Sequence, residues 1–154
     1  MKVEVSHLEA MRFEAKTAKS SFIIDCPIIS PVEYFLSGMI TCSATDIIML
    51  PKKKNITVTN LKVTGDALRN ESYPQKFNEL DLIYEFDSDT DDESAARYVM
   101  ASLETYCSTI NTVRSDVKIR YTVIHNGKII KDKVELISGG GAQIEMGEIQ
   151  SCPS

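Results

Sequence analysis

A long apolar helix is the feature that most constrains how this chain folds. Ser30 is a favourable N-cap, Pro31 stands at the first helical position, and Glu33 completes a capping box three residues after the cap. The helix should run to residue 50, and Pro51 is expected to end it. Apolar residues cover more than one of its faces, so the helix should be central and largely buried. One 154-residue subunit offers too little surface to cover it, so a partner subunit is expected.

The composition is typical of one globular domain. With 154 residues, of which 43% are hydrophobic, the chain is long enough for a single core. We assign residues 1–137 to this domain and residues 138–154, with the glycines 139–141 and Cys152, to a flexible or loosely docked extension. The net charge of −5 argues against nucleic-acid binding, and the basic residues 52–54 are better explained as favourable charges at a helix end.

The sequence predicts neither export nor membrane insertion. Its N-terminus has a charge at every second residue and lacks the apolar stretch of a signal peptide. The longest apolar runs, at 22–24 and 47–50, are too short to span a membrane. Four cysteines without an export signal are typical of a reducing compartment, so we expect a cytoplasmic protein with free thiols.

Alternating apolar residues predict several strands. The first two are short and antiparallel and are separated by a break near residues 6–9, and a loop over 65–75 joins the two long central strands. The dipeptide Asn126-Gly127 is the strongest short signal for a hairpin. The expected strands cover residues 3–5, 11–15, 21–25, 56–63, 77–86, 117–125 and 128–137.

A second helix is predicted after the acidic run 87–93. This run lacks the central glycine and the distal glutamate of an EF-hand calcium loop, so we interpret Thr90 and Glu93 as a second capping box. The helix should bury one stripe of side chains, with Cys107 near its C-terminal end. The stripe consists of Ala96, Val99, Met100, Leu103, Tyr106, Cys107 and Ile110.

Most catalytic motifs are absent from the sequence. It contains no Gly-rich phosphate loop, no Gly-x-Ser-x-Gly elbow and no paired-cysteine zinc spacing. His7 and His125 fall at predicted strand edges or turns and are weak candidates for a metal or Cys-His site. Cys26 is interpreted as a packing residue and Cys152 as an exposed spectator. We therefore expect no metal and no cofactor.

Cys42 and Cys107 are the best candidates for chemistry. Each falls in the apolar stripe of a predicted helix and is flanked by small and hydroxyl residues. A buried free cysteine is commonly an ordinary core residue. Two distant thiols also suit peroxide reduction, in which one attacks and the other resolves the sulfenic acid. Spacing alone leaves both alternatives open, because reactivity depends on pKa and exposure.

The segment around Cys42 resembles the first-cysteine helix of the OsmC/Ohr superfamily. That helix generically reads Pro-x-Glu-Leu-Leu, a few small residues and then Cys, and Pro31, Glu33 and Leu36 stand at the matching places before Cys42. Three further segments are similar to the YhfA-like branch of the family over residues 1 to about 125. They are Cys42-Ser-Ala-Thr-Asp46-Ile-Ile, Tyr106-Cys107-Ser108 and the opening strand Met11-Arg12-Phe13-Glu14.

The resemblance implies a mixed α/β (α+β) fold, with antiparallel sheets around two central cysteine-bearing helices, built as an intertwined homodimer. It also implies thiol-dependent reduction of organic hydroperoxides without metal or flavin. Cys42 would correspond to the peroxidatic thiol and Cys107 to the resolving one. A dithiol reductant, lipoylated or small-molecule, would then reopen their disulfide.

This chemistry needs a cation that holds Cys42 as a thiolate. Cys42 stands about twelve residues into its helix, beyond the reach of the helix dipole, and an ionised Asp46 one turn later would raise the thiol pKa. Arg12 is the leading candidate, because arginine is the family's usual partner for the reactive thiol; the alternative is an exposed strand charge. Glu33 lies roughly 180° around the helix and about 13 Å along it from Cys42. It could steady Arg12 or simply complete the capping box.

One segment departs from the family pattern. Members usually carry a Gly-rich loop before the first helix, whereas this chain has Cys26-Pro-Ile-Ile-Ser30. The shorter loop would change access to the thiols, or it marks a site that has lost its peroxidase role. Two alternatives to a thiol peroxidase therefore stay open: a non-catalytic OsmC-like dimer that binds a small hydrophobic ligand, and a structural or regulatory partner protein.

Overall fold

The computed structural model of this protein describes residues 1–137. The predicted extension at 138–154, which includes Cys152, lies outside the described residues. The chain divides into two compact units, residues 1–38 and the residues from 39 onward, and each is described by itself. The assignment of residues 1–137 to one domain stays a prediction.

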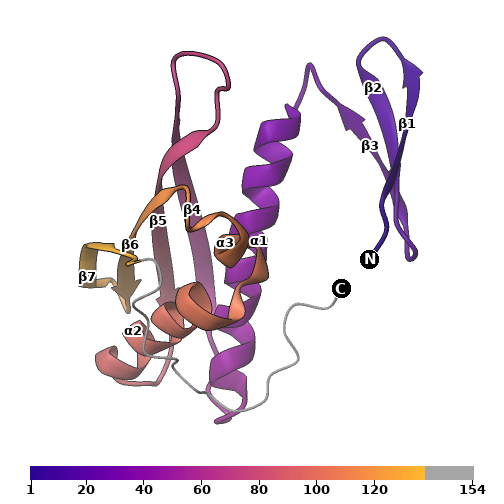
Figure 1. The fold of residues 1–154 in the computed structure, drawn as a ribbon. Helices are drawn as coiled ribbons and strands as arrows, with labels where there is room; N and C mark the ends of the chain where they lie inside the picture. Colours follow the sequence, from indigo (N-terminus) through magenta and orange to yellow (C-terminus); the bar gives the residue numbers. More distant parts are fainter. Residues whose placement is uncertain (138–154) are drawn as a thin grey trace. The chain divides into compact units, whose positions relative to one another are not determined.

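The first unit contains a three-stranded antiparallel sheet in the order β1-β2-β3 (Figure 1). Its strands are β1 (Glu4–Glu9), β2 (Arg12–Lys16) and β3 (Ser21–Asp25), and the last has the predicted bounds. The break predicted near residues 6–9 was wrong, because β1 continues to Glu9 and the chain turns at Ala10, whose φ is 47°. Val5 and His7 pair with β2 across the predicted break.

Helix α1 (Pro31–Lys52) begins where the sequence predicts. The Ser30 backbone N–H donates to Glu33 Oε2 at 2.7 Å, and the Glu33 N–H donates to Ser30 Oγ at 3.3 Å, so the capping box is present. The prediction that Pro51 ends the helix was wrong by two residues, because Pro51 lies inside the last turn. The turn after the helix contains Asn55, whose φ of 59° is left-handed, as is common after a helix end.

By length and composition alone, α1 could cross a membrane. A buried core helix of a water-soluble protein can have the same length and the same apolar composition. Seven residues of α1 are buried within the fold, and the polar Ser43 and Asp46 are among them. Buried polar side chains with hydrogen-bond partners fit a core helix, since lipid tails offer no such partners.

The second unit is built on a four-stranded sheet in the order β4-β5-β6-β7. The mixed α+β class is confirmed, but the sheet is not antiparallel throughout. The β5–β6 pair runs parallel, because the chain crosses over between these strands through α2 (Asp92–Ala101) and the helical segments that follow it. The other two pairs are antiparallel. The predicted hairpin is present, with Asn126 and Gly127 at φ 49° and 76°. The strands are β4 (Thr59–Arg69), β5 (Phe77–Asp87), β6 (Lys118–His125) and β7 (Lys128–Glu135).

Strand β4 is longer than predicted, because Gly65 lies inside it and does not begin a loop. A Cβ added at Gly65 would lie 2.6 Å from Ile40 Cδ1, which is too close for a real contact. The glycine therefore leaves room for the Ile40 side chain of α1 against the sheet. The connecting loop covers only residues 70–76.

The predicted second helix is broken into three pieces. They are α2 (Asp92–Ala101), the π-helix η1 (Ser102–Tyr106) and α3 (Ser108–Val113). The N-cap of α2 is Asp91, which accepts a hydrogen bond of 2.8 Å from the Ser94 N–H, so the predicted box of Thr90 and Glu93 was wrong by one position. Acidic side chains still favour this helix start, as expected from its dipole.

The core of the second unit lies between the helices and one face of the sheet (Figure 1). The opposite sheet face is polar, and there Arg120 bonds Glu79 and Asp81 at 2.6 Å each. This one-sided burial fixes which strand residues can line a site beside α1. The largest fully buried residues include Tyr84, Phe86, Met39, Ile47, Leu50, Leu82 and Leu103.

Candidate functional site

The structure brings Cys42 and Cys107 together. Cys42 lies in the middle of α1, and Cys107 lies between η1 and α3. Both thiols are free, and they are close enough to hydrogen-bond each other. Cys107 is completely buried, whereas 6% of Cys42 is exposed. Two residues 65 positions apart in the sequence therefore form one thiol pair, with Cys42 nearer to solvent.

Cys107 does not occupy the helical position that the sequence predicts. Its backbone is extended, with φ −72° and ψ 100°, and it forms the N-cap of α3. The apolar stripe nevertheless stays buried at Val99, Leu103 and Ile110, because α2, η1 and α3 present it to the same core. Cys107 is also the C-cap of η1, so it lies between the C-terminal end of one helical segment and the N-terminal end of the next. The Ile110 N–H donates to the Cys107 sulfur.

Burial dominates the electrostatics of Cys107. It raises the pKa of the thiol to about 12, and the adjacent Cys42 thiol acts in the same direction. The Thr109 hydroxyl, 3.3 Å from the Cys107 sulfur, and the Ile110 N–H act in the opposite direction but are weaker. Cys107 is therefore a neutral thiol at physiological pH.

A buried polar network lies beside the thiol pair. The Tyr84 hydroxyl on β5 donates to Ser43 Oγ at 2.9 Å, and Ser102 Oγ on η1 donates to Asp46 Oδ2 at 2.8 Å. Burial raises the pKa of Tyr84 well above its usual range, and the nearby Cys107, Asp46 and Cys42 act in the same direction. Burial also raises the pKa of Asp46, which is only 2% exposed, and the bond from Ser102 offsets part of this shift. Polar side chains from α1, β5 and η1 thus meet in one buried region of low dielectric constant.

Three members of this network were missed at the sequence level: Ser43, Tyr84 and Ser102. Tyr84 could have been found, because it alternates in phase with the buried residues Leu82 and Phe86 of β5. Ser102 carried no comparable signal, since its partner Asp46 is 56 residues away in the sequence.

Arg12 and Glu33 both lie in the first unit. Arg12 is 44% exposed and forms ion pairs with Glu9 at 2.7 Å and Asp25 at 3.4 Å. Glu33 accepts hydrogen bonds from Ser30, and these lower its pKa. The capping interpretation of Glu33 is confirmed, while a role for either residue at Cys42 stays a prediction.

His125 is buried and belongs to a different cluster. Its Nδ1 lies 2.9 Å from Asp92 Oδ1, and its Nε2 lies 2.9 Å from Ser88 Oγ. These two contacts join the ends of β5 and β6 to the start of α2. It is not paired with a cysteine in any of these contacts. Among residues 1–137, no group of three His, Cys, Asp or Glu side chains could hold a metal ion. Cys26 is half-buried at the end of β3.

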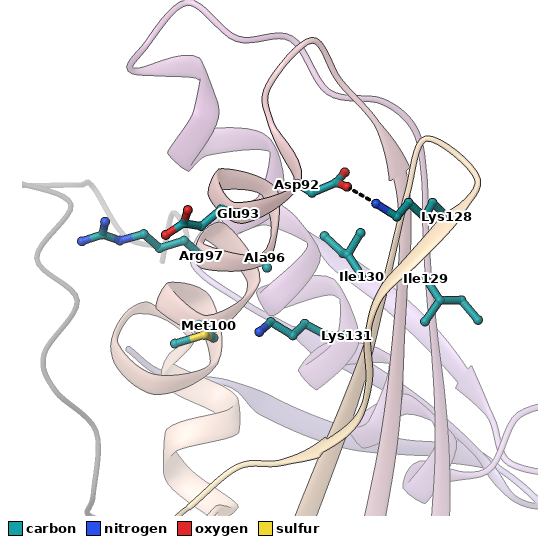
Figure 2. A pocket seen from close by; sticks show the side chains of 9 residues that line it. All are labelled: Asp92, Glu93, Ala96, Arg97, Met100, Lys128, Ile129, Ile130 and Lys131. Atoms are coloured by element: carbon teal, nitrogen blue, oxygen red, sulfur yellow. Dashed lines mark hydrogen bonds and ion pairs between the residues drawn. The ribbon is translucent and has the colours of Figure 1, made fainter.

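A groove of about 660 Å³ lies between α2 and β7 (Figure 2). Asp92 and Lys128 close one end of it with a hydrogen bond of 2.8 Å. Neither cysteine lines this groove, so it is separate from the thiol pair. Its lining combines both signs of charge with apolar side chains: Asp92, Glu93, Ala96, Arg97, Met100, Lys128, Ile129, Ile130 and Lys131.

A family model described as OsmC-like protein matches residues 25–122, which is more than half of the chain. This chain belongs to the OsmC-like family. The superfamily inferred from the two cysteine segments is thereby confirmed, whereas membership of the YhfA-like branch stays a prediction. Comparison with curated proteins gave no match.

Solved structures share the OsmC-like fold. A hypothetical protein from Aquifex aeolicus VF5 is 24% identical, with a TM-score of 0.71 over 81% of this chain and 96% of its own. The OsmC like protein from Mycoplasma pneumoniae is 18% identical, with a TM-score of 0.70 over 80% and 95% of the two chains. The organic hydroperoxide resistance protein OhrB of Bacillus subtilis is also 18% identical, with a TM-score of 0.53 over 80% and 98%.

The raised pKa of Cys107 predicts slow alkylation. At pH 8, iodoacetamide should modify Cys107 in the folded OsmC-like protein at least about 100-fold more slowly than in urea, because few thiolates form. The rate should rise with pH up to about pH 12. Peptide mass spectrometry measures it, with half-buried Cys26 as the internal reference. Equal rates for Cys107 in the folded and unfolded protein would contradict the assignment.

Proposed function

We propose that this OsmC-like protein reduces organic hydroperoxides, with Cys42 as the attacking thiol and Cys107 as the resolving thiol. The observation that carries the proposal is the pairing of two free thiols from distant segments in one buried site. The likeness in fold to a protein named for organic hydroperoxide resistance supports the substrate class. Free thiols also fit action in a reducing cytoplasm.

The roles follow from the difference between the two thiols. Cys42 is the one that reaches the surface, so a substrate can approach it. Cys107 is fully buried and its raised pKa keeps it protonated, which suits a thiol that waits for an intermediate on its neighbour. Neither step requires a metal or an organic cofactor.

The reaction is written in three balanced steps. The Cys42 thiolate attacks the outer oxygen of R–O–O–H, so that an S–O bond forms, the O–O bond breaks, and the alkoxide takes up a proton and leaves as an alcohol. The Cys107 thiol then attacks the sulfenic acid on Cys42, which forms the disulfide and releases water. A dithiol reductant finally restores both thiols by thiol–disulfide exchange.

Replacement of Cys42 tests this function directly. With cumene hydroperoxide and dithiothreitol, Cys42→Ser should lower peroxide consumption by more than about 100-fold, because the attacking nucleophile is lost. Cys107→Ser should still be oxidised once, with the sulfenic acid persisting on Cys42. Cys26→Ser serves as the matched control and should retain full activity.

Full burial of Cys107 equally suits a packing residue, which favours the non-catalytic ligand-binding dimer as the second candidate. Absence of peroxide consumption from the unmodified protein would favour that alternative. Retention of peroxide consumption in Cys42→Ser would refute the assignment of Cys42 as the attacking thiol.

We further propose that Arg12 activates Cys42. Its guanidinium is always charged and offers five donors, so it can hold Glu9 or Asp25 and still bind a thiolate or a peroxide oxygen. Glu33 then acts through the start of α1 rather than on the thiol, because its oxygens already bind Ser30.

Arg12→Ala should slow alkylation of Cys42 at neutral pH by about 10-fold and suppress peroxide turnover without unfolding the protein. Arg12→Lys should retain part of the alkylation rate, since lysine keeps the positive charge but lacks the planar arrangement of donors of a guanidinium. Stopped-flow alkylation and peroxide assays measure both effects. If both rates stay unchanged in Arg12→Ala, Arg12 is a surface charge.

We propose a homodimer, because the first unit has little core of its own. Within residues 1–38, all of which the structure describes, Ala15 is the only buried hydrophobic residue. Val5, Met11 and Phe22 are each about half exposed. A small sheet needs a packed apolar face to be stable, and a partner subunit can supply it.

Light scattering after size exclusion should give twice the chain mass of 17.2 kDa. Phe22→Ser should weaken the dimer, because it removes apolar surface from the proposed interface. Ile83→Ser is the control: it lies on the polar sheet face, opposite Thr64 and Thr122, and should leave the mass unchanged. A stable monomer at micromolar concentration would exclude the dimer.

A further inference from the structure

Cys107 is held by the wide turn of η1. Its backbone N–H donates to the Ser102 carbonyl at 2.8 Å, five residues earlier, which closes the π-helical turn. The next residue, Ser108, already begins α3. Such single π turns inside helical segments are frequent at functional sites. The place of Cys107 is therefore set by the place of Ser102.

Ser102 is in turn fixed to the segment of α1 that carries Cys42. Its hydroxyl donates to Asp46 Oδ2 at 2.8 Å and also lies 3.4 Å from the Ser43 carbonyl oxygen. Asp46 stands one helical turn after Cys42, and Ser43 directly follows Cys42 in the sequence. Ser102 is completely buried and Asp46 is 2% exposed, so water does not compete for this bond. One serine thus connects the backbones of both thiol segments.

We propose that Ser102 and Asp46 are positioning residues that hold the Cys107 thiol in reach of Cys42 for disulfide formation. The step they serve is the attack of Cys107 on the Cys42 sulfenic acid, in which the S–S bond forms, the S–O bond breaks, and the hydroxyl leaves with the thiol proton as water. The proposal rests on the proposed function for this step, but the positioning itself applies to any oxidant.

A buried carboxyl group would be costly here without such a role. Burial disfavours its charged form, and a well-packed apolar side chain would avoid that cost. The amide of an asparagine would still accept the Ser102 hydroxyl without carrying a charge. Substitutions that keep or remove the hydrogen bond between Ser102 and residue 46 can therefore distinguish a positioning role from a general effect on packing.

The experiment measures disulfide formation between Cys42 and Cys107 with two oxidants, cumene hydroperoxide and diamide. Ser102→Ala should slow closure of the disulfide by about 10-fold or more with both, because a small misplacement of reacting atoms is enough for that loss. Dimedone should trap more Cys42 sulfenic acid in this variant under peroxide, while the rate of the first oxidation stays unchanged. Thr112→Ala is the control, because its hydroxyl bonds only within α3, to the Ser108 carbonyl at 2.7 Å.

Asp46→Ala should reproduce the defect, and Asp46→Asn should restore closure to within about 3-fold, since it keeps an acceptor for Ser102. This pair decides the question if Ser102→Ala does not fold. Wild-type closure rates with diamide in Ser102→Ala or Asp46→Ala would overturn the proposal. Slow closure with diamide in both, but no reaction of the unmodified protein with peroxide, would support positioning while refuting the peroxidase function.

Discussion

The contacts of Ser102 are the constraint on which the rest of the site depends. Its carbonyl accepts the Cys107 N–H at 2.8 Å, and its hydroxyl donates to Asp46 at 2.8 Å. Both bonds lie in a region where water is excluded, so each is stronger than it would be at the surface. They join the π turn of η1 to α1. Tyr84 of β5 lies beside the same region, because its hydroxyl bonds Ser43 of α1 and its pKa is affected by Asp46 and both thiols.

The same burial that strengthens these bonds separates the properties of the two thiols. It raises the pKa of Cys107 to about 12 and leaves that residue inaccessible, whereas Cys42 keeps an exposed edge. A thiol that stays protonated in the resting protein is protected from direct oxidation. In the proposed mechanism the attacking thiolate forms at Cys42, and a guanidinium such as that of Arg12 is suited to stabilise its negative charge.

Local chemistry made much of the fold predictable. The Ser30–Glu33 capping box, the strand at 21–25 and the Asn126-Gly127 hairpin depend on neighbouring residues alone, and each is present. Long-range contacts explain the failures. Gly65 resembled a loop residue because its contact with Ile40 is invisible in sequence, and Cys107 seemed helical because the apolar stripe hides the π turn. The thiol pairing came from the family resemblance and not from periodicity.

The most direct test of this account is peptide mapping after addition of one equivalent of an organic hydroperoxide per reduced chain, without reductant. The account predicts an intrachain disulfide between Cys42 and Cys107 in most molecules, with Cys26 still a free thiol, because the two paired sulfurs already lie in contact. Unoxidised Cys42, or Cys42 oxidised to sulfinic acid beside a reduced Cys107, would contradict it.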